Sequence, residues 1–265
     1  MRRVRGLSLK TDTPMILHSS CRSLEKGFDR FKREALRWVF EGWPVGDYYE
    51  AALPGRDAFC MRDTCHQCVG AEALGLSAHN YNMFQKFASS ISASRDYCGY
   101  WEIDRYDRPC PVDYVDDSDF WYNLPANFDV VDACYRMYCY TGDRRYLEDA
   151  DVDRFCALSM EDFVRRWDRD GDGLPDRRES DGRRGIASYD EGELSMRDLK
   201  VGVDLVCAMA RAYFSCAEMC RLTNRHEYAR IYLRRADELK KTLLTRWWSP
   251  EKGLALGEQW RTAGY

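Results

Sequence analysis

The stretch Met196–Thr245 decides the fold class, and it reads MRDLKVGVDLVCAMARAYFSCAEMCRLTNRHEYARIYLRRADELKKTLLT. Apolar residues recur in its first half every three or four positions: Leu199, Val203, Val206, Cys207, Ala210 and Phe214. The second half repeats the pattern with Tyr228, Ile231, Tyr232, Leu239 and Leu243. This period places apolar side chains on one face of an α-helix. The stretch therefore predicts two consecutive helices, Met196–Asn224 and Glu227–Thr245.

The same spacing predicts five more helices toward the N-terminus. They are an amphipathic helix with a stripe from Leu24 to Val39, and helices at Met61–Leu74, Ser77–Tyr97, Asn127–Thr141 and Arg144–Trp167. Ser195 and Asp198, like Asn224 and Glu227, have the spacing of a capping box. Gly75 and Gly142 stand where a helix needs a left-handed C-terminal residue. No run of alternating residues indicates strands, so residues 1–265 are predicted to form a single all-α domain.

Composition excludes several classes of protein. The 265 residues carry a net charge of −4 and no basic stripe interleaved with aromatics, which argues against nucleic-acid binding. Neither a secretory signal nor a run of 18 apolar residues is present, so we expect no membrane partner. The twelve cysteines lie mostly within helical patterns, and we interpret them as reduced, buried thiols of a cytoplasmic protein. The alternative is a disulfide framework whose export signal lies upstream of this chain.

Three long loops separate the predicted helices, at Val45–Cys60, Cys98–Ala126 and Asp168–Ser195. Long loops in a compact domain are usually functional or disordered. Residues 97–128 hold nine aromatic residues and seven carboxylates, which is too aromatic for disorder. Aromatic faces and ionised acceptors suit a sugar, because C–H faces stack on rings while hydroxyls need hydrogen-bonding partners. The alternative is that Trp101, Phe120 and Trp121 plug the end of a helical bundle.

Two shorter motifs could carry chemistry. Arg62 and Asp63 open a predicted helix, where they could grip vicinal hydroxyls together or simply place a favourable charge in a first turn. Asp168–Glu179 matches the calcium loop DxDxDGx5E, which predicts a calcium site at Asp168, Asp170, Asp172 and Asp176. The alternative is a tight turn without metal. Cys65-His66-Gln67-Cys68 lacks a second pair of ligands and does not indicate a structural zinc site.

In order along the chain, YYEAALPGRD (48–57), MRD (61–63), DSDFW (117–121) and DRDGDGLP (168–175) resemble the six-hairpin glycosidases, the superfamily of glucoamylases and trehalases. The resemblance implies an (α/α)6 toroid of six helical hairpins whose loop-lined mouth binds carbohydrate. It also implies no required cofactor other than the calcium predicted above. With about seven of twelve helices, the toroid would be incomplete.

The resemblance also implies roles for residues. Asp119 is the first choice for the general acid, Asp117 the second and Glu102 the third, since Tyr122 and Asn123 stand where glucoamylases have adjacent glutamates. The expected substrate-binding residues are Arg62, Asp63, Trp101, Trp121, Tyr122, Asn123 and Glu179. The reaction would be glycoside hydrolysis, with inversion if the two carboxyls lie about 6.5–9.5 Å apart.

The helix count predicts a fragment, because twelve helices with their loops need roughly 350–400 residues. Such a fragment would expose apolar inner helices, and it would self-associate or bind a complementing chain through them. In related enzymes the catalytic base comes late in the chain, so this chain would lack it. Two other functions stay open: a carbohydrate-binding remnant without catalysis, and a helical-repeat scaffold for protein partners.

Overall fold

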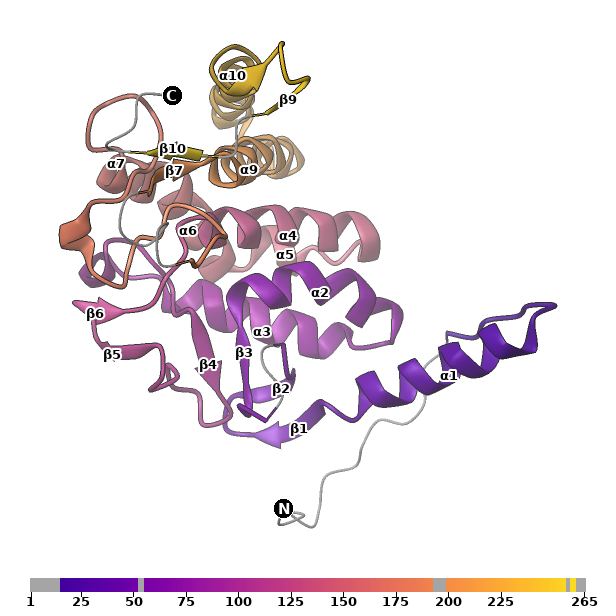
Figure 1. Ribbon diagram of the computed structural model, residues 1–265. Coiled ribbons are helices and arrows are strands. Elements are labelled where there is room, and N and C mark those ends of the chain that lie inside the picture. The colour runs from indigo at the N-terminus through magenta and orange to yellow at the C-terminus, as the bar shows by residue number, and fades with distance from the viewer. Residues whose placement is uncertain (1–14, 52–54, 193–198, 256–257, 261–265) are drawn as a thin grey trace.

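The structure is a computed structural model that describes residues 15–51, 55–192, 199–255 and 258–260 (Figure 1). Helices make up most of it, as the apolar periodicity predicts. They are α1 (Arg22–Leu36), α2 (Met61–Ala73), α3 (Ser77–Ser90), α4 (Pro125–Thr141), α5 (Arg145–Glu148), α6 (Ala150–Leu158), α7 (Val164–Trp167), α9 (Val203–Leu222) and α10 (His226–Thr242). Shorter turns of 3₁₀ or π type lie at η1 (Ala93–Arg95), η2 (Ser159–Phe163), η3 (Glu179–Asp181) and η4 (Leu243–Trp247).

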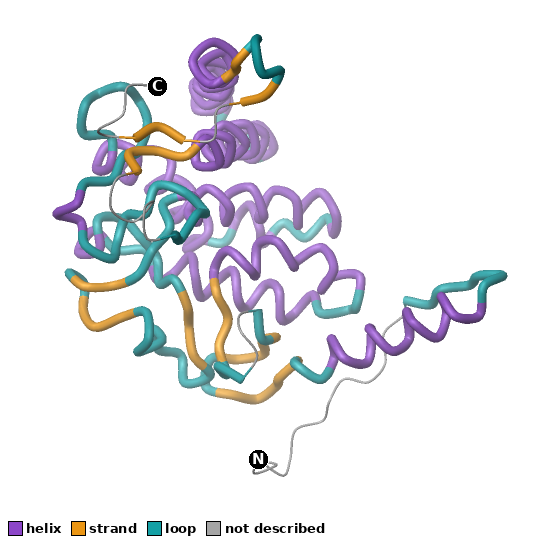
Figure 2. Tube along the Cα trace, viewed as in Figure 1, coloured by secondary structure: helices purple, strands orange, loops and turns teal. Residues whose placement is uncertain are grey.

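Short antiparallel ladders occupy the connections, where no strand was expected (Figure 2). The pairs are β1 (Val39–Trp43) with β2 (Gly46–Tyr49), β3 (Ala58–Cys60) with β4 (Glu102–Asp104), β5 (Tyr114–Asp116) with β6 (Asp119–Phe120), β7 (Leu199–Gly202) with β10 (Glu258–Trp260), and β8 (Trp248–Ser249) with β9 (Leu254–Ala255). These strands have two to five residues. Most of these strands have only two or three residues, too few to give a periodic signal, and the chain remains mostly helical, which is compatible with the predicted all-α class.

The helices form two layers. Helix α4 lies between α2 and α9, while α3, α6 and α10 cover the other side of this row. Successive hairpins α2–α3, α4–α6 and α9–α10 therefore give an arc of alternating inner and outer helices. A closed ring of six hairpins is not formed by the described residues.

The core lies between the two layers and is rich in aromatic residues. Trp167, Phe128 and Phe163 are fully buried, and the Trp167 indole donates a hydrogen bond to the Asp96 carbonyl at 3.0 Å. Nine of the twelve cysteines are buried, as expected, while Cys21, Cys139 and Cys207 are exposed. The described part of the chain has no helix long and apolar enough to cross a bilayer.

Three helix boundaries differ from the prediction for local reasons. Helix α3 ends at Ser90, because the backbone of Ile91 leaves the helical region with a ψ of 132°, and the chain then turns through Asp96 and Tyr97, which both have positive φ. The expected helix Arg144–Trp167 is broken at Asp149, whose extended backbone ends α5 and whose carboxylate caps α6. Helix α9 begins only at Val203, because residues 199–202 pair with β10.

The predicted C-terminal glycines of two helices are confirmed, and one predicted capping box does not form. Gly75 and Gly142 have the left-handed φ values of 81° and 72° that their positions require. Asn224 also has a positive φ, and α10 begins at His226 with no side-chain cap, so the box of Asn224 and Glu227 does not form. The other box, Ser195 with Asp198, lies outside the described residues.

Candidate functional site

The N-terminal ends of α2, α4 and α9 meet at one end of the inner row, and two of the long loops cross them. The amide of Met61 donates to the Trp101 carbonyl, and the amide of Leu124 donates to the Ile186 carbonyl, both at 2.8 Å. At the third helix end, the Gly202 amide donates to the Ala187 carbonyl, also at 2.8 Å. The aromatic loop and the loop after the acidic motif are thus held over the same helix ends.

Arg62 is the centre of a group of side chains at these helix ends. Its guanidinium lies 5.3 Å from the Trp101 ring centre and 5.9 Å from that of Tyr189, within cation–π range. Its Nη1 atom lies 3.0 Å from Oε1 of Glu191. Both members of this ion pair keep access to solvent, with 24% and 39% of their side-chain surface exposed. A polar ligand can therefore reach a cation and a carboxylate beside the half-buried Tyr189 ring, while Trp101, 8% exposed, lies beneath the guanidinium.

Asp129, on the second turn of α4, joins this group through Tyr189. The Tyr189 hydroxyl donates a hydrogen bond of 2.5 Å to Oδ1 of Asp129. Burial raises the pKa of Asp129 to about 7, although the hydrogen bond from Tyr189 and the charge of Arg136 oppose the shift. A carboxyl that holds its proton near neutrality has the protonation state of a general acid, although the free oxygen of Asp129, Oδ2, is buried in this conformation.

Asn123 completes the group, which we call the helix-end cluster: Arg62, Trp101, Asn123, Asp129, Tyr189 and Glu191. The Asn123 amide is fully buried and donates to the Ser188 carbonyl at 3.0 Å and to Glu191 at 3.3 Å. It therefore fixes the loop that carries Tyr189 and Glu191. Of the predicted substrate-binding residues, the structure brings Arg62, Trp101 and Asn123 together here.

Glu102 lies below this cluster, in a buried group of titratable side chains. It is 1% exposed and accepts a hydrogen bond of 2.8 Å from Arg56, whose Nη1 atom is also 3.5 Å from Asp113. Burial and the neighbouring Asp113 carboxyl raise the pKa of Glu102 to about 7. Trp101 and Trp121 line a small cavity together with these two carboxyls. Glu102 thus has the expected protonation of an acid, but it is sealed from solvent.

Glu102 should make the protein less stable as the pH rises. Its folded-state pKa exceeds the unfolded value, so its stabilising contribution is complete below about pH 4.5 and is lost as the pH rises to about 7. Glu102→Gln removes this loss, because the amide stays neutral. We expect the free energy of unfolding of Glu102→Gln, relative to wild type, to rise by about 1–3 kcal/mol between pH 4.5 and pH 8.

Urea unfolding at both pH values measures this difference. Glu148→Gln is the matched control, because Glu148 is half exposed and pairs only with Arg144 on the surface. The same change with pH in both variants would contradict a role for the buried carboxyl.

The hydrogen bonds and ion pairs of Asp117 and Asp119 are with residues outside the helix-end cluster. Asp117 accepts hydrogen bonds from Arg95, Tyr114 and Ser94, which lower its pKa to about 2. A carboxylate so stabilised is a poor proton donor, so the second choice for the acid is not supported. Asp119 is half exposed on β6, and its carboxylate lies 3.7 Å from Arg183. The first choice for the acid therefore sits on an outer hairpin.

The remaining predicted sugar contacts have different surroundings. Tyr122 has no exposed surface and its hydroxyl donates to Asn127, so it is a core residue and not a substrate contact in this conformation. Trp121 is half-buried against the cavity described above. Asp63 is half-buried in the first turn of α2 and interacts with the Cys60 thiol. Glu179 is exposed at the start of η3.

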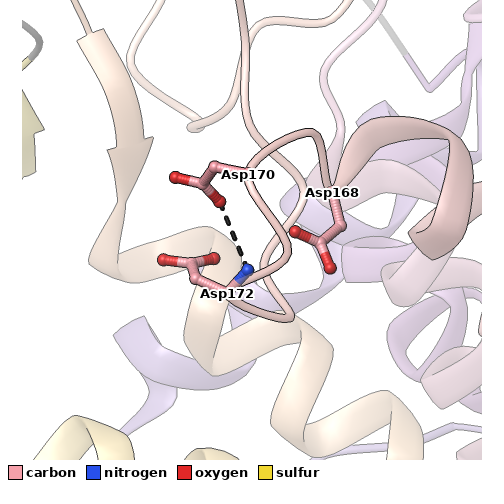
Figure 3. A group of neighbouring side chains, drawn as sticks. All are labelled: Asp168, Asp170 and Asp172. Carbon is pink, nitrogen blue, oxygen red and sulfur yellow. Dashed lines mark hydrogen bonds between the residues drawn. The ribbon is translucent and has the colours of Figure 1, made fainter.

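The predicted calcium loop brings three of its carboxylates together (Figure 3). One oxygen from each of Asp168, Asp170 and Asp172 lies within 4.8 Å of the others. Backbone amides of the loop also donate to these carboxylates, as in the 3.0 Å bond from Gly173 to Asp168. The Lys200 ammonium lies 2.5 Å from Asp170 and 3.7 Å from Asp172. Asp176, the fourth expected ligand, is 5% exposed and is not part of this group.

The cysteines of the Cys65-His66-Gln67-Cys68 motif point into the core. Both thiols are fully buried, and burial raises the pKa of each. The His66 ring instead packs edge-on against Tyr189, 6.0 Å between ring centres. The two thiols thus lie in the core, whereas the His66 ring lies against Tyr189.

Sequence reasoning did not find Asp129, Tyr189, Glu191, Arg56 or Asp113. Asp129 follows the motif Asn-Leu-Pro-Ala-Asn-Phe inside a predicted helix and was given no role. Tyr189 and Glu191 lie in the long loop Asp168–Ser195, in which only the calcium motif at Asp168–Glu179 was singled out. An aromatic residue followed two positions later by an acid, in a loop too long for a plain connection, is the signal that could have singled them out.

Comparisons with protein-family models, with curated proteins and with solved structures found no match to this chain. Its function is therefore inferred from the residues of the helix-end cluster and their surroundings.

Proposed function

We propose that this protein is a glycoside hydrolase domain in which the helix-end cluster binds a sugar and Asp129 protonates the departing glycosidic oxygen. The observation that carries the proposal is the convergence of Arg62, Trp101, Tyr189 and Glu191 beside a carboxyl whose pKa is about 7. The side chains come from α2, from the aromatic loop and from the loop before α9. Each type has a use in sugar recognition.

Sugar binding follows from the chemistry of these side chains. The faces of Trp101 and Tyr189 can pack against the C–H faces of a pyranose ring. The Arg62–Glu191 ion pair offers a donor and an acceptor 3.0 Å apart, which matches two neighbouring hydroxyls. Because the pair is only partly exposed, its hydrogen bonds compete less with bulk water than those of a surface ion pair.

Proton donation follows from the surroundings of Asp129. In the reaction a protonated carboxyl passes its proton to the glycosidic oxygen as the C–O bond breaks and positive charge develops on the sugar. Water forms the new C–O bond at the same carbon, and its proton passes to the second carboxylate of the cluster, Glu191. Burial keeps Asp129 protonated to about pH 7. The Tyr189 hydroxyl donates to Oδ1 and so orients the carboxyl, which leaves Oδ2 to carry the proton. Oδ2 is buried and has no hydrogen-bond partner among the described residues, so the departing oxygen must displace the side chains over it to accept that proton.

The fold is part of the same proposal. The hairpins α2–α3, α4–α6 and α9–α10 have the alternation of inner and outer helices that an (α/α)6 toroid requires. Three further hairpins would be needed to complete the six of the toroid. In such a ring the N-terminal ends of the inner helices would surround the sugar.

A panel of aryl glycosides and oligosaccharides tests the proposal, with hydrolysis and binding measured on the same protein. Release of a phenol or a free sugar is the expected result. Binding by calorimetry without hydrolysis would instead support the carbohydrate-binding protein considered above. The absence of both binding and hydrolysis across the whole panel would contradict a carbohydrate function.

We further propose that Asp168, Asp170 and Asp172 hold calcium in competition with Lys200. Calcium prefers six to eight oxygen ligands, and the three carboxylates offer part of such a set. Lys200→Ala removes a cation from the site, so we expect it to tighten calcium binding severalfold. Glu179→Ala should leave the affinity unchanged, because Glu179 is not part of the group.

Calorimetric titration with CaCl2 measures both variants against wild type, with MgCl2 as the control for nonspecific binding of divalent cations. Asp170→Asn is expected to abolish binding. Equal affinities in wild type and Asp170→Asn would remove this loop as a calcium site.

A further inference from the structure

Helix α1 presents an apolar stripe that the rest of the described chain leaves largely exposed, although Ala35 and Trp38 at its C-terminal end line a cavity together with residues of α2. Figure 1 shows α1 extending away from the two helical layers, and Leu36 is its one buried residue. Leu24 and Phe31 are 60% and 77% exposed, and Trp38, just after the helix, is 38% exposed. Exposure of this much apolar surface along one helix face is unusual in a monomeric protein.

The spacing of the stripe is that of a coiled coil. The residues Cys21, Leu24, Phe28, Phe31, Ala35 and Trp38 follow one another at alternating steps of three and four. This repeat of seven keeps one seam of a helix against a second helix over its whole length. The occupant indicated by the spacing is therefore another helix rather than an irregular segment.

A flanking segment widens the same surface. The Lys32 ammonium donates to the Met15 carbonyl at 3.0 Å, and the Ser19 amide donates to Glu25 at 2.9 Å. These bonds hold residues 15–19 along one side of α1. Ile16 and Leu17 lie in that segment and are 68% and 39% exposed.

We propose that α1 is a dimerisation helix, and that two copies of the chain pair their α1 helices side by side in antiparallel orientation. In this register Phe28 of one copy faces Phe31 of the other, Leu24 faces Ala35, and Cys21 faces Trp38. Each layer then combines a large side chain with a smaller one, or two phenylalanines, so the layers have similar volumes. A parallel pair would instead stack Cys–Cys, Leu–Leu, two Phe–Phe, Ala–Ala and Trp–Trp layers, whose volumes differ widely.

The charges beside the seam favour the same arrangement. Glu25 and Lys32 flank the stripe on one side, one heptad apart. In an antiparallel pair, such flanking positions face each other, so Glu25 of each copy approaches Lys32 of the other. One twofold axis thus gives two attractive contacts, and no like charges meet there. Within its own chain Glu25 accepts a bond from the Ser19 amide, while the Lys32 ammonium donates to Met15 and lies 3.5 Å from Asp29, so the pair across the interface would share Lys32 with these partners.

The antiparallel arrangement also leaves room for both bodies. Residues 36–38 join α1 to the body, and Cys21 lies at the far end of the helix. Pairing Cys21 with Trp38 of the second copy places the two bodies at opposite ends of the helix pair. The dimer surface proposed here is α1, whereas the sequence led us to expect association through exposed inner helices. On the inner helices α4 and α9, Asp132 forms ion pairs with Arg136 and Arg211.

Light scattering coupled to size-exclusion chromatography, in reducing buffer, tests the proposal with the full chain. We expect wild type to have twice the 31.0 kDa mass of one chain at micromolar concentration. Phe31→Asp should elute as a monomer with an unchanged circular-dichroism spectrum, since α1 stands apart from the core. Tyr140→Asp is the control, because Tyr140 is also an exposed aromatic residue, 57% exposed on α4, but lies off the stripe.

Charge reversal tests the orientation. Glu25→Lys and Lys32→Glu should each weaken the dimer a few-fold, and the double variant should restore it, because the pairs are re-formed with exchanged signs. A wild-type monomer, or a dimer unchanged by Phe31→Asp, would overturn the proposal. A double variant no tighter than the single ones would overturn the antiparallel pairing. Dimerisation is measured by mass and glycoside hydrolysis by product release, so the failure of one proposal can be distinguished from the failure of the other.

Discussion

Replacement of Asp129 by asparagine is expected to lower kcat for a phenyl glycoside by about 10²–10⁴-fold, the range that general acid catalysis supplies. The asparagine amide has nearly the size of the carboxyl and can still accept the hydrogen bond from Tyr189. It cannot pass a proton to the departing oxygen. The loss should therefore appear in kcat, while KM changes little.

The leaving group and the pH dependence give this prediction a sharper form. A dinitrophenyl glycoside departs with little protonation, so Asp129→Asn should reduce its hydrolysis far less than that of the phenyl glycoside. In wild type, activity should fall above about pH 7, where Asp129 loses its proton. That fall should be absent in Asp129→Asn.

Asp119→Asn is the matched control, since it makes the same chemical change at a half-exposed carboxylate beside Arg183. Its activity should stay close to that of wild type. If Asp119→Asn removed hydrolysis and Asp129→Asn did not, the acid would be the residue that the family resemblance implies. The assignment to the helix-end cluster would then be wrong.

Gly185→Ala is expected to destabilise the protein by about 2–5 kcal/mol. Gly185 has a φ of 75°, which costs an alanine about 1–2 kcal/mol. A methyl group there would also overlap the ring of Trp167, which is fully buried and bonded to the Asp96 carbonyl. Overpacking of this kind costs a further 1–3 kcal/mol or so. Urea unfolding measures the sum.

Gly142→Ala separates these two effects. Gly142 has a similar φ of 72°, but nothing lies within 4 Å of the added carbon. The Gly142→Ala variant should therefore lose only the backbone contribution to the free energy of unfolding, about 1–2 kcal/mol. Equal losses in the two variants would mean that Trp167 moves aside freely. Gly185 leads directly into the loop that carries Tyr189, so its substitution should also reduce sugar binding, whereas Gly142→Ala should not.

Most helices could be predicted from the sequence, because each buries an apolar stripe that repeats with the helical period. Met61–Leu74 and Asn127–Thr141 were located to within two residues of α2 and α4 at each end. The boundaries that failed depend on distant contacts or on single backbone angles. Leu199–Gly202 joins β10, and α5 ends where the Asp149 backbone becomes extended.

The candidate site was predictable only in part. Arg62 could be placed at a helix start from its position before an apolar stripe, and Trp101 from the aromatic content of its loop. The choice among carboxyls could not be made in this way. Glu102, Asp117 and Asp119 lie within eighteen residues of one another, yet their surroundings differ. Glu102 is buried beside Asp113, Asp117 forms an ion pair with Arg95, and Asp119 is half exposed to solvent.

By itself, the sequence determined that this is a mostly helical protein with an amphipathic first helix, an aromatic loop and an acidic turn. These features depend on local period and composition, which a short window of residues contains. Only the tertiary structure decided that Asp129, Tyr189 and Arg62 meet, and which carboxyl keeps its proton near neutrality. A pKa depends on burial and on neighbouring groups, and for Asp129 these include Tyr189 and Arg62, each sixty or more residues away in the chain.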